Sequence, residues 1–568
     1  MAASAPGAVT VPAGVVSGAG VVSGGGVSVV RCPDVSATVA QLRRWRPELV
    51  PAVSAAVPGA RAAVLARLWG ALGREPVPQV VGRRVVGGEL VLVLADGRQV
   101  RGPADGAELF AGVDSGLRVS VAGRAVADPA ELVSLLGLAG GGVVAGEVAN
   151  SVANMALARG ARAVAVARGS GSGDGLVRSA VAWEQVVVDG HPVHPGCRTR
   201  VGMSTLEVLR YGPEHGPVVE LELVAVPAGR WVSSGAGLPP VLPVHPWQRE
   251  HVLGSYGWLR RTGRVVRARP LLSLRTVVPV ADGSWQWKTA VDVQMTSAVR
   301  TVSAAAVRNG PVVTGLLVGL ARRLPGLRVL REVAAGAVVV DGVPCRSLAV
   351  VRRRVPRVAA GVQVMPVAAL AAPVGVPGGP SVVAGLVRAG YGGDPVVFAG
   401  ELARVLLGPV LGALGLGVGL EAHGQNVVLV WRGVRLVGMW YRDVGGVRLD
   451  VDRLAAAGVV VPPVHGDVAV GDSAEVAVTA LASVGTALGE PLAVLAREFG
   501  VEPERLWSRV AQVAREVVAG LPVVVRGEVA AAVFGQVWPV KATLSMRLSA
   551  DPLVPRWAWV ANPMAGLG

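Results

Sequence analysis

Hydrophobic residues follow a helical period at the start of the chain and a strand period after it. Between about Ser36 and Leu72 they recur every three or four positions, which predicts helices. Residues 80–121 alternate between apolar and polar side chains and carry Asp96-Gly97, a turn signal between strands. Two more helices are predicted at Pro129–Leu136 and Gly146–Arg168. Helices and strands therefore both contribute to the first part of the chain.

The second half of the chain begins at about Leu316 and mixes the same two periods. A helix comes first, and strands are predicted at 329–340 and 347–351. A proline-rich connection leads to a helical segment at 397–414, and the pattern beyond Asp443 is largely helical to about Val525. A mixture of helices and strands is therefore expected throughout.

One predicted helix carries an unusual polar stripe. Glu147, Asn150, Ser151 and Asn154 are spaced by three and four residues, so they share one face of a helix otherwise made of Ala, Val and Met. The stripe is either the solvated face of the helix or a face with a function.

The stretch from Glu421 to Asn426 crowds a carboxylate, an imidazole and two amides into one turn. It precedes an apolar strand at 427–431, and a second apolar run at 434–440 leads to Tyr441-Arg442-Asp443. A hairpin of these two strands brings Glu421, Asn426 and Asp443 to one end. Oxygen ligands clustered in this way suit Mg²⁺ with phosphates, and the alternative is a capped turn with solvated side chains.

Two loops place histidine next to proline, at His191–Gly202 and at Leu242–Gln248. The prolines of the first loop exclude a regular helix. His191, His194 and Cys197 are three residues apart and could bind a metal, but no fourth ligand is nearby and the loop is rich in cations. A cationic loop for phosphate or carboxylate fits better.

Further polar residues interrupt apolar strands. Ser273 and Arg275 share one face of a predicted strand and Thr276 has the other, while Lys288 leads into a strand that ends at Val293.

A helix is predicted to open just after these strands. Thr296 or Ser297 would cap it, and Arg300 lies one turn in, so its N-terminus is a natural anion site. Asn309-Gly310 is predicted to end this helix. Near the end of the chain, Lys541 and Arg547 share a face if the segment is a strand and lie nearly two turns apart if it is a helix.

Composition makes the rare residues informative. The chain has 568 residues, 52% of them apolar, with no Ile, and its cations are Arg except for Lys288 and Lys541. A compact ammonium at two positions indicates a local requirement for it. The net charge is +16, but the arginines are scattered and lack interleaved aromatic residues, which argues against nucleic acid.

No targeting segment is evident in the sequence. Three cysteines give no disulfide framework and suit a reducing cytoplasm. The N-terminus lacks a basic region before its apolar residues, so it is a poor signal peptide. The charge-free run 358–387 contains four prolines, which favours a buried strand and a connection over a spanning helix. Residues 1–30 are of low complexity and are predicted to be disordered.

The order of these motifs resembles the NRPS-independent siderophore synthetases of the aerobactin-synthetase (IucA/IucC) type. Each motif alone is weak, and their joint order is specific. The matching elements are Glu147-x2-Asn150-Ser151-x2-Asn154, the loop His191–Gly202, Tyr211-x-Pro213-Glu214, His245-Pro246-Trp247-Gln248, Ser273-x-Arg275-Thr276, Lys288 with Thr296-Ser297-x2-Arg300, Glu421-x-His423-x-Gln425-Asn426, Arg442-Asp443, and Lys541 through Arg547 to Asn562-Pro563.

The resemblance implies an ATP- and Mg²⁺-dependent ligase. Such an enzyme adenylates a carboxylate of citrate, of a citrate derivative or of another dicarboxylic acid and condenses it with an amine or hydroxyl, releasing AMP and pyrophosphate. The implied fold is α+β, a cupped hand of thumb, fingers and palm with mixed and antiparallel sheets, in a cytoplasmic homodimer without nucleic acid or membrane partners. The expected divisions are an extension at 1–30, a thumb at 31–140, fingers at 141–315 and a palm at 316–568.

The resemblance also implies residue roles. ATP would be bound by His191, Ser273, Arg275, Thr276, Lys288, Arg300, His423 and Gln425. The carboxylate substrate would be bound by Thr296, Arg300, His423, Lys541 and Arg547. The expected metal ligands are Glu421, Asn426 and Asp443, and the expected catalytic residues are Lys288, Arg300 and His423.

Two rival functions remain open at this stage. The same cluster could serve a kinase-like phosphotransferase, although there is no glycine-rich phosphate loop before a lysine strand. It could also belong to a non-catalytic anion-binding relative. One departure from the family is Arg198, where Lys is common, so Arg198 is given no role.

Overall fold

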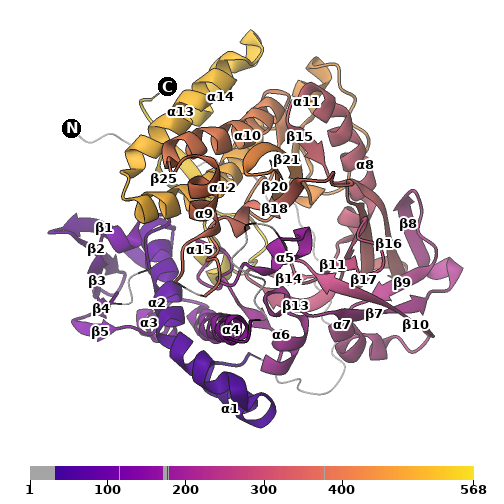
Figure 1. Ribbon diagram of the computed structural model, residues 1–568, viewed down its shortest axis with the longest axis horizontal. Helices are drawn as coiled ribbons and strands as arrows, with labels where there is room; N and C mark the ends of the chain where they lie inside the picture. Colours follow the sequence, from indigo (N-terminus) through magenta and orange to yellow (C-terminus); the bar gives the residue numbers. More distant parts are fainter. Residues whose placement is uncertain (1–31, 114–115, 170–175, 177, 377, 568) are drawn as a thin grey trace.

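A computed structural model describes residues 32–113, 116–169, 176, 178–376 and 378–567 (Figure 1). The segment predicted to be disordered, residues 1–30, lies outside these residues. The described chain folds into an N-terminal helical unit with a small sheet, a large antiparallel sheet, and a C-terminal layer of helices around a second sheet.

The N-terminal unit packs long helices beside a five-stranded meander. The meander has the order β1-β2-β3-β4-β5, with a turn at Asp96-Gly97 as predicted. Asp128 accepts hydrogen bonds from two backbone N–H groups at the start of α3, which fixes that helix end. The elements are α1 (Val35–Trp45), α2 (Val50–Arg74), β1 (Val80–Val86), β2 (Glu89–Leu94), β3 (Gln99–Pro103), β4 (Val119–Val121), β5 (Arg124–Val126), α3 (Pro129–Leu136) and α4 (Gly141–Ala167).

The large sheet has eight strands in the order β8-β16-β17-β12-β11-β10-β7-β9, all pairs antiparallel. Strands β16 and β17 lie beyond residue 315, whereas the other six strands lie before it. The predicted boundary between fingers and palm therefore separates strands that belong to one sheet. The strands are β7 (Val219–Ala225), β8 (Trp231–Gly235), β9 (Val241–Val244), β10 (Arg260–Pro270), β11 (Thr276–Pro279), β12 (Trp285–Thr289), β16 (Glu332–Val340) and β17 (Val343–Arg354). The adjoining helices are α5 (Ala180–Gln185), α6 (Thr205–Tyr211), α7 (Pro246–His251) and α8 (Ala304–Leu320).

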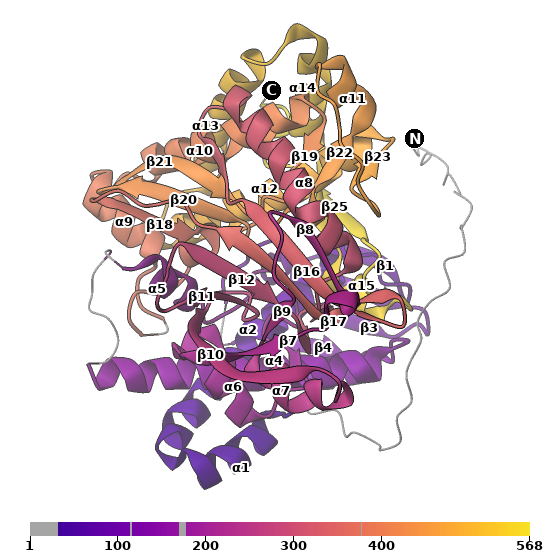
Figure 2. The ribbon, with the colours of Figure 1, turned by 90° about the vertical axis from the view of Figure 1, so that its right-hand side faces the viewer.

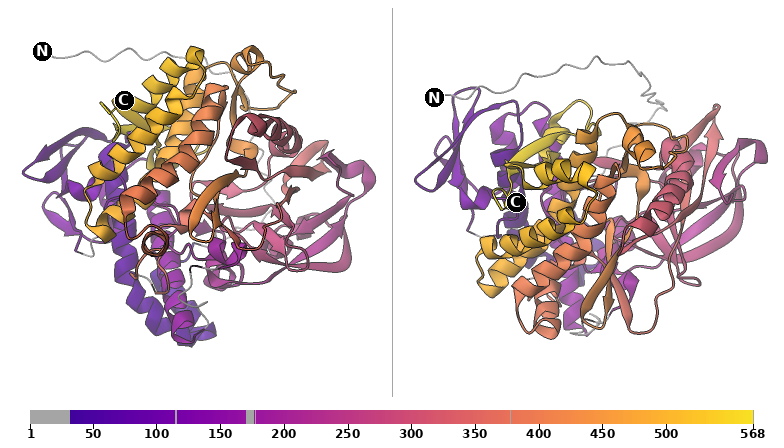
Figure 3. Two further views of the ribbon diagram at one scale, coloured as in Figure 1. Left: turned by 45° about the horizontal axis from the view of Figure 1, so that its top comes forward. Right: turned by 90° about the horizontal axis from the view of Figure 1, so that it is seen from above.

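The C-terminal layer surrounds a four-stranded sheet with the order β15-β21-β20-β18. Helices from this part of the chain gather on the side away from the large sheet (Figures 2 and 3). The elements are β15 (Leu327–Val329), β18 (Val362–Pro366), α9 (Val382–Gly390), α10 (Pro395–Gly415), β20 (Val427–Arg432), β21 (Arg435–Tyr441), α11 (Val451–Ala456), α12 (Ser473–Phe499), α13 (Pro503–Ala519) and α14 (Val523–Phe534).

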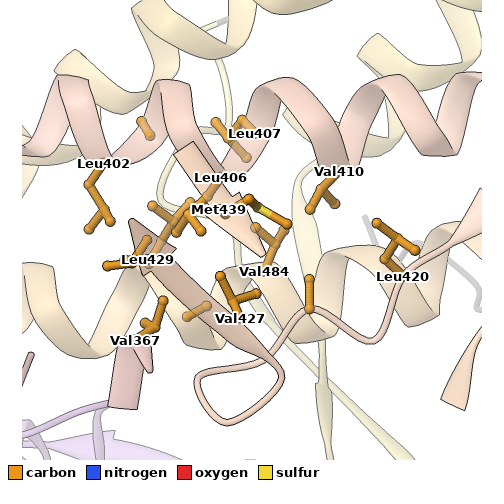
Figure 4. Packing of buried hydrophobic residues seen from close by; sticks show 14 of the residues in the cluster. Val367, Leu402, Leu406, Leu407, Val410, Leu420, Val427, Leu429, Met439 and Val484 are labelled. Atoms are coloured by element: carbon orange, nitrogen blue, oxygen red, sulfur yellow. The ribbon is translucent and has the colours of Figure 1, made fainter. Parts of the chain in front are cut away.

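A hydrophobic core holds β20 and β21 against α10. Leu402 and Leu406 of the helix lie over Leu429 and Met439 of the strands (Figure 4). Val427 joins the same core, because it is two residues from Leu429 and shares its face. Burying one such leucine side chain contributes about 2 kcal/mol. The strand that follows the Glu421–Asn426 turn is therefore firmly anchored.

Three small sheets complete the fold. Their orders are β14-β13-β6, β19-β22-β23 and β24-β25. The strands are β6 (Arg200–Val201), β13 (Val291–Met295), β14 (Ala298–Arg300), β19 (Val418–Gly419), β22 (Arg448–Asp450), β23 (Ala469–Val470), β24 (Val537–Lys541) and β25 (Trp557–Ala561). Helix α15 (Thr543–Leu548) follows β24, so Lys541 ends a strand and Arg547 lies in a helix.

The prediction that a helix begins at Thr296 is wrong. Residues 298–300 form β14, and α8 begins at Ala304 with Ser303 as its cap. Asn309 lies inside α8 and does not end it. Thr296 instead has a positive φ of 55°, so it makes a tight turn between β13 and β14. Helix α5 leads directly into the histidine loop, and residues 186–188 between them form neither helix nor strand.

Four described helical segments are long and apolar enough to cross a membrane by length and composition: Pro47–Arg74, Ala304–Arg323, Pro395–Gly415 and Ser473–Phe499. In the last two, 61% and 67% of the most apolar window is buried inside the protein. Most of the apolar surface of these two helices is therefore packed inside the protein. The run 358–387 is divided between β18 and α9.

Candidate active site

The predicted site residues meet in one cavity of about 490 Å³ between the large sheet, the C-terminal sheet and α12. We call it the reaction cavity. Only Arg547 of the predicted set does not line it. The residues that do are His191, Ser273, Arg275, Thr276, Lys288, Thr296, Arg300, Glu421, His423, Gln425, Asn426, Asp443 and Lys541.

Lys288 and Asp443 form an ion pair inside this cavity. The Lys288 ammonium donates to both carboxylate oxygens of Asp443, at 2.8 Å each. Lys288 lies in β12, near the centre of the large sheet. Asp443 follows β21 and has a positive φ of 70°. Burial opposes ionisation of Asp443, but Lys288 outweighs it, and the pKa of the carboxyl lies below its usual range.

Two arginines form the cationic wall of the cavity. Arg300 donates to the Thr296 hydroxyl at 2.7 Å and to the Met295 carbonyl at 3.0 Å, while Arg275 donates to the Thr301 carbonyl. Burial and the neighbouring Arg300 charge lower the pKa of Arg275 to about 10. Both guanidiniums therefore remain charged at neutral pH and are held by neutral oxygens, which leaves their charge available to an anion.

The turn Glu421–Asn426 lies at the end of the β20–β21 hairpin, as predicted, since Val427 pairs with Tyr441. The Asn426 side-chain nitrogen donates to the Glu421 carbonyl at 3.1 Å, which leaves the amide oxygen as a possible ligand. A Cβ on Gly446 would lie 2.0 Å from a Glu421 carboxylate oxygen, so the glycine makes room for that carboxylate.

The predicted metal ligands form a chemically suitable set for Mg²⁺. Two carboxylates and an amide oxygen are the hard ligands this ion prefers. Glu421, Asn426 and Asp443 all line the reaction cavity. Because Asp443 is paired with Lys288, a metal bound there would share the carboxylate with the ammonium or displace it.

The histidines of the cavity are neutral at physiological pH. Burial lowers the pKa of both His191 and His423, and neighbouring cations lower that of His191 further. The Nδ1 atom of His423 accepts a hydrogen bond from the Gln425 backbone N–H at 3.2 Å. His194 uses both ring nitrogens, with the Gly196 N–H and the Ser297 hydroxyl, so it is not free for the metal site considered for this loop.

The two C-terminal cations differ in position. Lys541 reaches the cavity and lies 3.6 Å from a Glu421 oxygen, with 44% of its side chain exposed. Arg547 instead pairs with Glu147 and donates to the Ser297 carbonyl at 3.2 Å. It therefore supports the turn that holds Thr296 rather than lining the cavity.

The polar stripe of α4 is buried, so it is not the solvated face of that helix. Asn150 accepts from the Arg200 N–H at 2.8 Å, Ser151 accepts from the Arg198 N–H at 2.9 Å, and Asn154 donates to the Arg198 carbonyl at 3.0 Å. The stripe thus fixes the backbone of the loop that carries His191.

Glu184 supports the site and was not predicted from the sequence. Glu184 receives two hydrogen bonds from Arg442, at 2.6 and 3.0 Å, and Arg442 also donates to the Gln425 carbonyl. This buried pair ties α5 to the turn Glu421–Asn426. Arg442 belongs to one of the motifs in the sequence. Glu184 does not, and its partner Arg442 is too far away in sequence for the pair to be predicted.

Two parts of the chain match models of known protein families. Residues 179–237 and 240–372 match the IucA / IucC family, and residues 398–552 match the family described as "Ferric iron reductase FhuF-like transporter". Staphyloferrin A synthase of Staphylococcus aureus (strain NCTC 8325 / PS 47) is 26% identical to this chain. The match covers 48% of this chain and 53% of the length of the synthase. The rhizobactin siderophore biosynthesis protein RhbC of Rhizobium meliloti (strain 1021) is 28% identical over 47% and 54%. The chain spans about half the length of these relatives.

Solved structures extend the likeness over most of the chain. The petrobactin biosynthesis protein AsbB of Bacillus anthracis str. Sterne has a TM-score of 0.73 at 17% identity and covers 91% of this chain and 98% of its own. ATP-bound aerobactin synthetase IucA of Klebsiella pneumoniae has a TM-score of 0.69 at 20% identity, covering 89% and 99%. The fold is therefore the α+β fold of the siderophore synthetases. Residues 179–237 and 240–372 are therefore similar to the IucA / IucC family, and the solved structures extend the shared fold over about nine tenths of the chain.

Proposed function

We propose that the protein is an ATP-dependent siderophore synthetase. It adenylates a carboxylate of citrate, of a citrate derivative or of a related dicarboxylic acid and joins it to an amine or hydroxyl, releasing AMP and pyrophosphate. The observation that carries this proposal is the meeting of thirteen predicted residues, from separate stretches between His191 and Lys541, in the reaction cavity. The relatives' printed names, D-ornithine–citrate ligase among them, support a ligase acting on citrate.

The nucleotide is proposed to lie against the large sheet. Ser273, Arg275, Thr276 and Lys288 line this side of the cavity, and His191, Arg300, His423 and Gln425 surround it. Adenylation brings a carboxylate oxygen in line with the α-phosphate, so the protein has mainly to position two anions and neutralise them. Two charged arginines and an ammonium supply that neutralisation, and neutral histidines supply hydrogen bonds.

The acid is proposed to lie toward Lys541. Thr296 and Arg300 form one end of its site and Lys541 the other, with His423 between nucleotide and acid. Several cations around one small molecule suit a polyanion such as citrate. Arg547 is proposed to act through Glu147 and the Ser297 carbonyl on the placement of Thr296.

Mg²⁺ is proposed to be held by Glu421, Asn426 and Asp443. When bound, it would offset phosphate charge during adenylation. Lys288 keeps the Asp443 carboxylate ionised, because its charge opposes protonation. Catalysis by Lys288, Arg300 and His423, assembly as a homodimer and a cytoplasmic location complete the proposal.

Measuring the nucleotide product tests the proposed function. Mg-ATP is incubated with citrate and hydroxylamine, and AMP and ADP are separated. AMP with pyrophosphate supports adenylation, whereas ADP with phosphate supports the kinase-like alternative. ATP binding without turnover of any acid supports a non-catalytic relative.

A further inference from the structure

One face of α12 forms a wall shared by the reaction cavity and two smaller cavities. Thr479, Ser483, Thr486 and Glu490 are spaced by three and four residues, so they follow one side of the helix. The first three line the reaction cavity. Thr486 and Glu490 line a second cavity of about 150 Å³, and Glu490 also lines a third of about 170 Å³. We call these the inner and outer cavities.

The inner cavity continues the reaction cavity. Its walls include His191, Ser273, Thr296, Arg300 and His423, which line both. The outer cavity lies on the other side of Glu490, between α2, the loop at 187–193 and the C-terminal half of α12. Glu490 therefore stands where a molecule approaching from the outer cavity would meet the proposed adenylate.

No described residue donates a hydrogen bond to the Glu490 carboxylate. The nearest charged residues form hydrogen bonds to other groups. Arg67 donates to the His191 carbonyl at 3.0 Å, Arg497 donates to the Phe110 carbonyl at 2.8 Å, and Asp189 is held by two hydrogen bonds from Arg159. The Glu490 side chain is partly buried and lines both cavities, so its carboxylate is open to a ligand from either side.

Other charged and titratable groups border the two cavities. They are Arg74 and Glu108 in the outer cavity, and His191, Cys197, Arg198, Arg200, Arg300 and His423 in the inner cavity. Burial raises the pKa of Glu490 to about 7, and Asp189 adds to the rise, while Arg67 and Arg497 oppose it. A carboxylate with this pKa accepts protons efficiently near neutral pH.

We infer that Glu490 binds the ammonium group of an incoming primary alkylamine and removes one of its protons. This inference rests on the proposed function and specifies its second substrate as an amine. A carboxylate attracts an ammonium group and gains no such attraction from a hydroxyl. The position of Glu490 between the outer cavity and the reaction cavity supplies the geometry.

The proposed step transfers the acyl group from AMP to the amine. The ammonium gives one proton to the Glu490 carboxylate, and the nitrogen lone pair forms a C–N bond to the acyl carbon. The bond between that carbon and the AMP oxygen breaks, and AMP leaves with the electron pair. The nitrogen loses its second proton to water as the amide forms, and Glu490 later returns its proton to solvent.

Separating the two half-reactions tests this role. ATP–pyrophosphate exchange with the best acid reports adenylation, and amide formation with 1,3-diaminopropane, 1,5-diaminopentane or D-ornithine reports the amine step. For Glu490→Gln, the ratio of amide formation to exchange is expected to fall about 100-fold. Glu490→Asp should restore part of it. Glu504→Gln, at an exposed carboxylate on α13, is the matched control and should leave the ratio unchanged.

The pH profile separates a base from a structural residue. Amide formation by the unsubstituted protein should rise through about pH 7 and then level off, because Glu490 must be ionised. Glu490→Gln should keep rising toward alkaline pH, because only free amine then reacts.

Three results would overturn the role of Glu490. They are an unchanged ratio, a joint loss of exchange and amide formation in both Glu490 variants, and a protein that accepts hydroxylamine but none of the three amines. Absence of exchange with every acid tested would instead refute the proposed function.

Discussion

The ammonium of Lys288 binds both carboxylate oxygens of Asp443 at 2.8 Å, across 155 residues of sequence. The contact joins β12 of the large sheet to the end of β21 in the C-terminal sheet. Asp443 adopts a positive φ of 70°, which costs a non-glycine residue backbone energy and is common at functional sites. The pair therefore links the proposed phosphate and metal sites.

Breaking this pair should abolish adenylation. Lys288→Met and Asp443→Asn are each expected to reduce ATP–pyrophosphate exchange at least 100-fold, because each removes a group that neutralises or positions phosphate. Each should also lower the free energy of unfolding by about 1–3 kcal/mol, since a partner is left unpaired. The double variant should regain stability without regaining activity. Near-normal exchange by either single variant would contradict the assignment.

Adding one methyl group beside Glu421 should weaken magnesium use. A Cβ at Gly446 would lie 2.0 Å from a Glu421 oxygen, whereas a Cβ at Gly445 would lie 3.6 Å from an Asp443 oxygen. Gly446→Ala must therefore displace the carboxylate, and the Mg²⁺ concentration for half-maximal exchange should rise about tenfold, a shift of about 1.4 kcal/mol. Gly445→Ala is the control. Equal magnesium titrations for the two variants would refute Glu421 as a ligand.

Removing the Lys541 charge should affect the acid more than the nucleotide. Lys541→Met is expected to raise the KM for the carboxylate about tenfold while changing the KM for ATP little, because the ammonium is proposed to bind a substrate carboxylate. Arg556→Met removes an exposed cation just before β25 and serves as the control. An unaltered carboxylate KM in Lys541→Met would remove Lys541 from the substrate site.

Stability should fall in mild acid because two buried histidines resist protonation. Burial lowers the pKa of His194 and of His245 to about 3, against about 6.5 in an unfolded chain. Below pH 6.5 the unfolded state therefore binds more protons, and each histidine costs about 2 kcal/mol of unfolding free energy by pH 5.

Urea unfolding at pH 7.5 and pH 5 measures this effect. His245→Asn can still accept the Trp247 N–H bond that His245 accepts at 3.2 Å, but it cannot titrate, so its loss of stability should be smaller. His465→Asn, at an exposed position, should behave like the unsubstituted protein. Identical losses in all three proteins would contradict the explanation.

Local patterns predicted the centre of the site well. The turn Glu421–Asn426 and the return of the chain at Asp443 follow from two apolar runs joined by a short connection, a signal contained within one stretch. The two lysines stood out because composition made them rare. These features needed no knowledge of distant contacts.

Features that depend on distant partners escaped prediction. Thr296 and Ser297 have the chemistry of a helix cap, but β14 pairs with β13 there, and the cap falls to Ser303. Arg547 carries a charge suited to the cavity, yet Glu147 on α4 binds it. Glu490 lies in an ordinary helical pattern, and only the cavities on either side of it distinguish it.

The proposed function is tested most directly by measuring the release of AMP and pyrophosphate from Mg-ATP with hydroxylamine as nucleophile. The acids to compare are citrate, succinate, 2-oxoglutarate and a citrate monoamide. We expect AMP and pyrophosphate in equal amounts with at least one of these acids, and loss of both products in Lys288→Met. ADP in place of AMP, or acid-dependent turnover that survives in Lys288→Met, would contradict it.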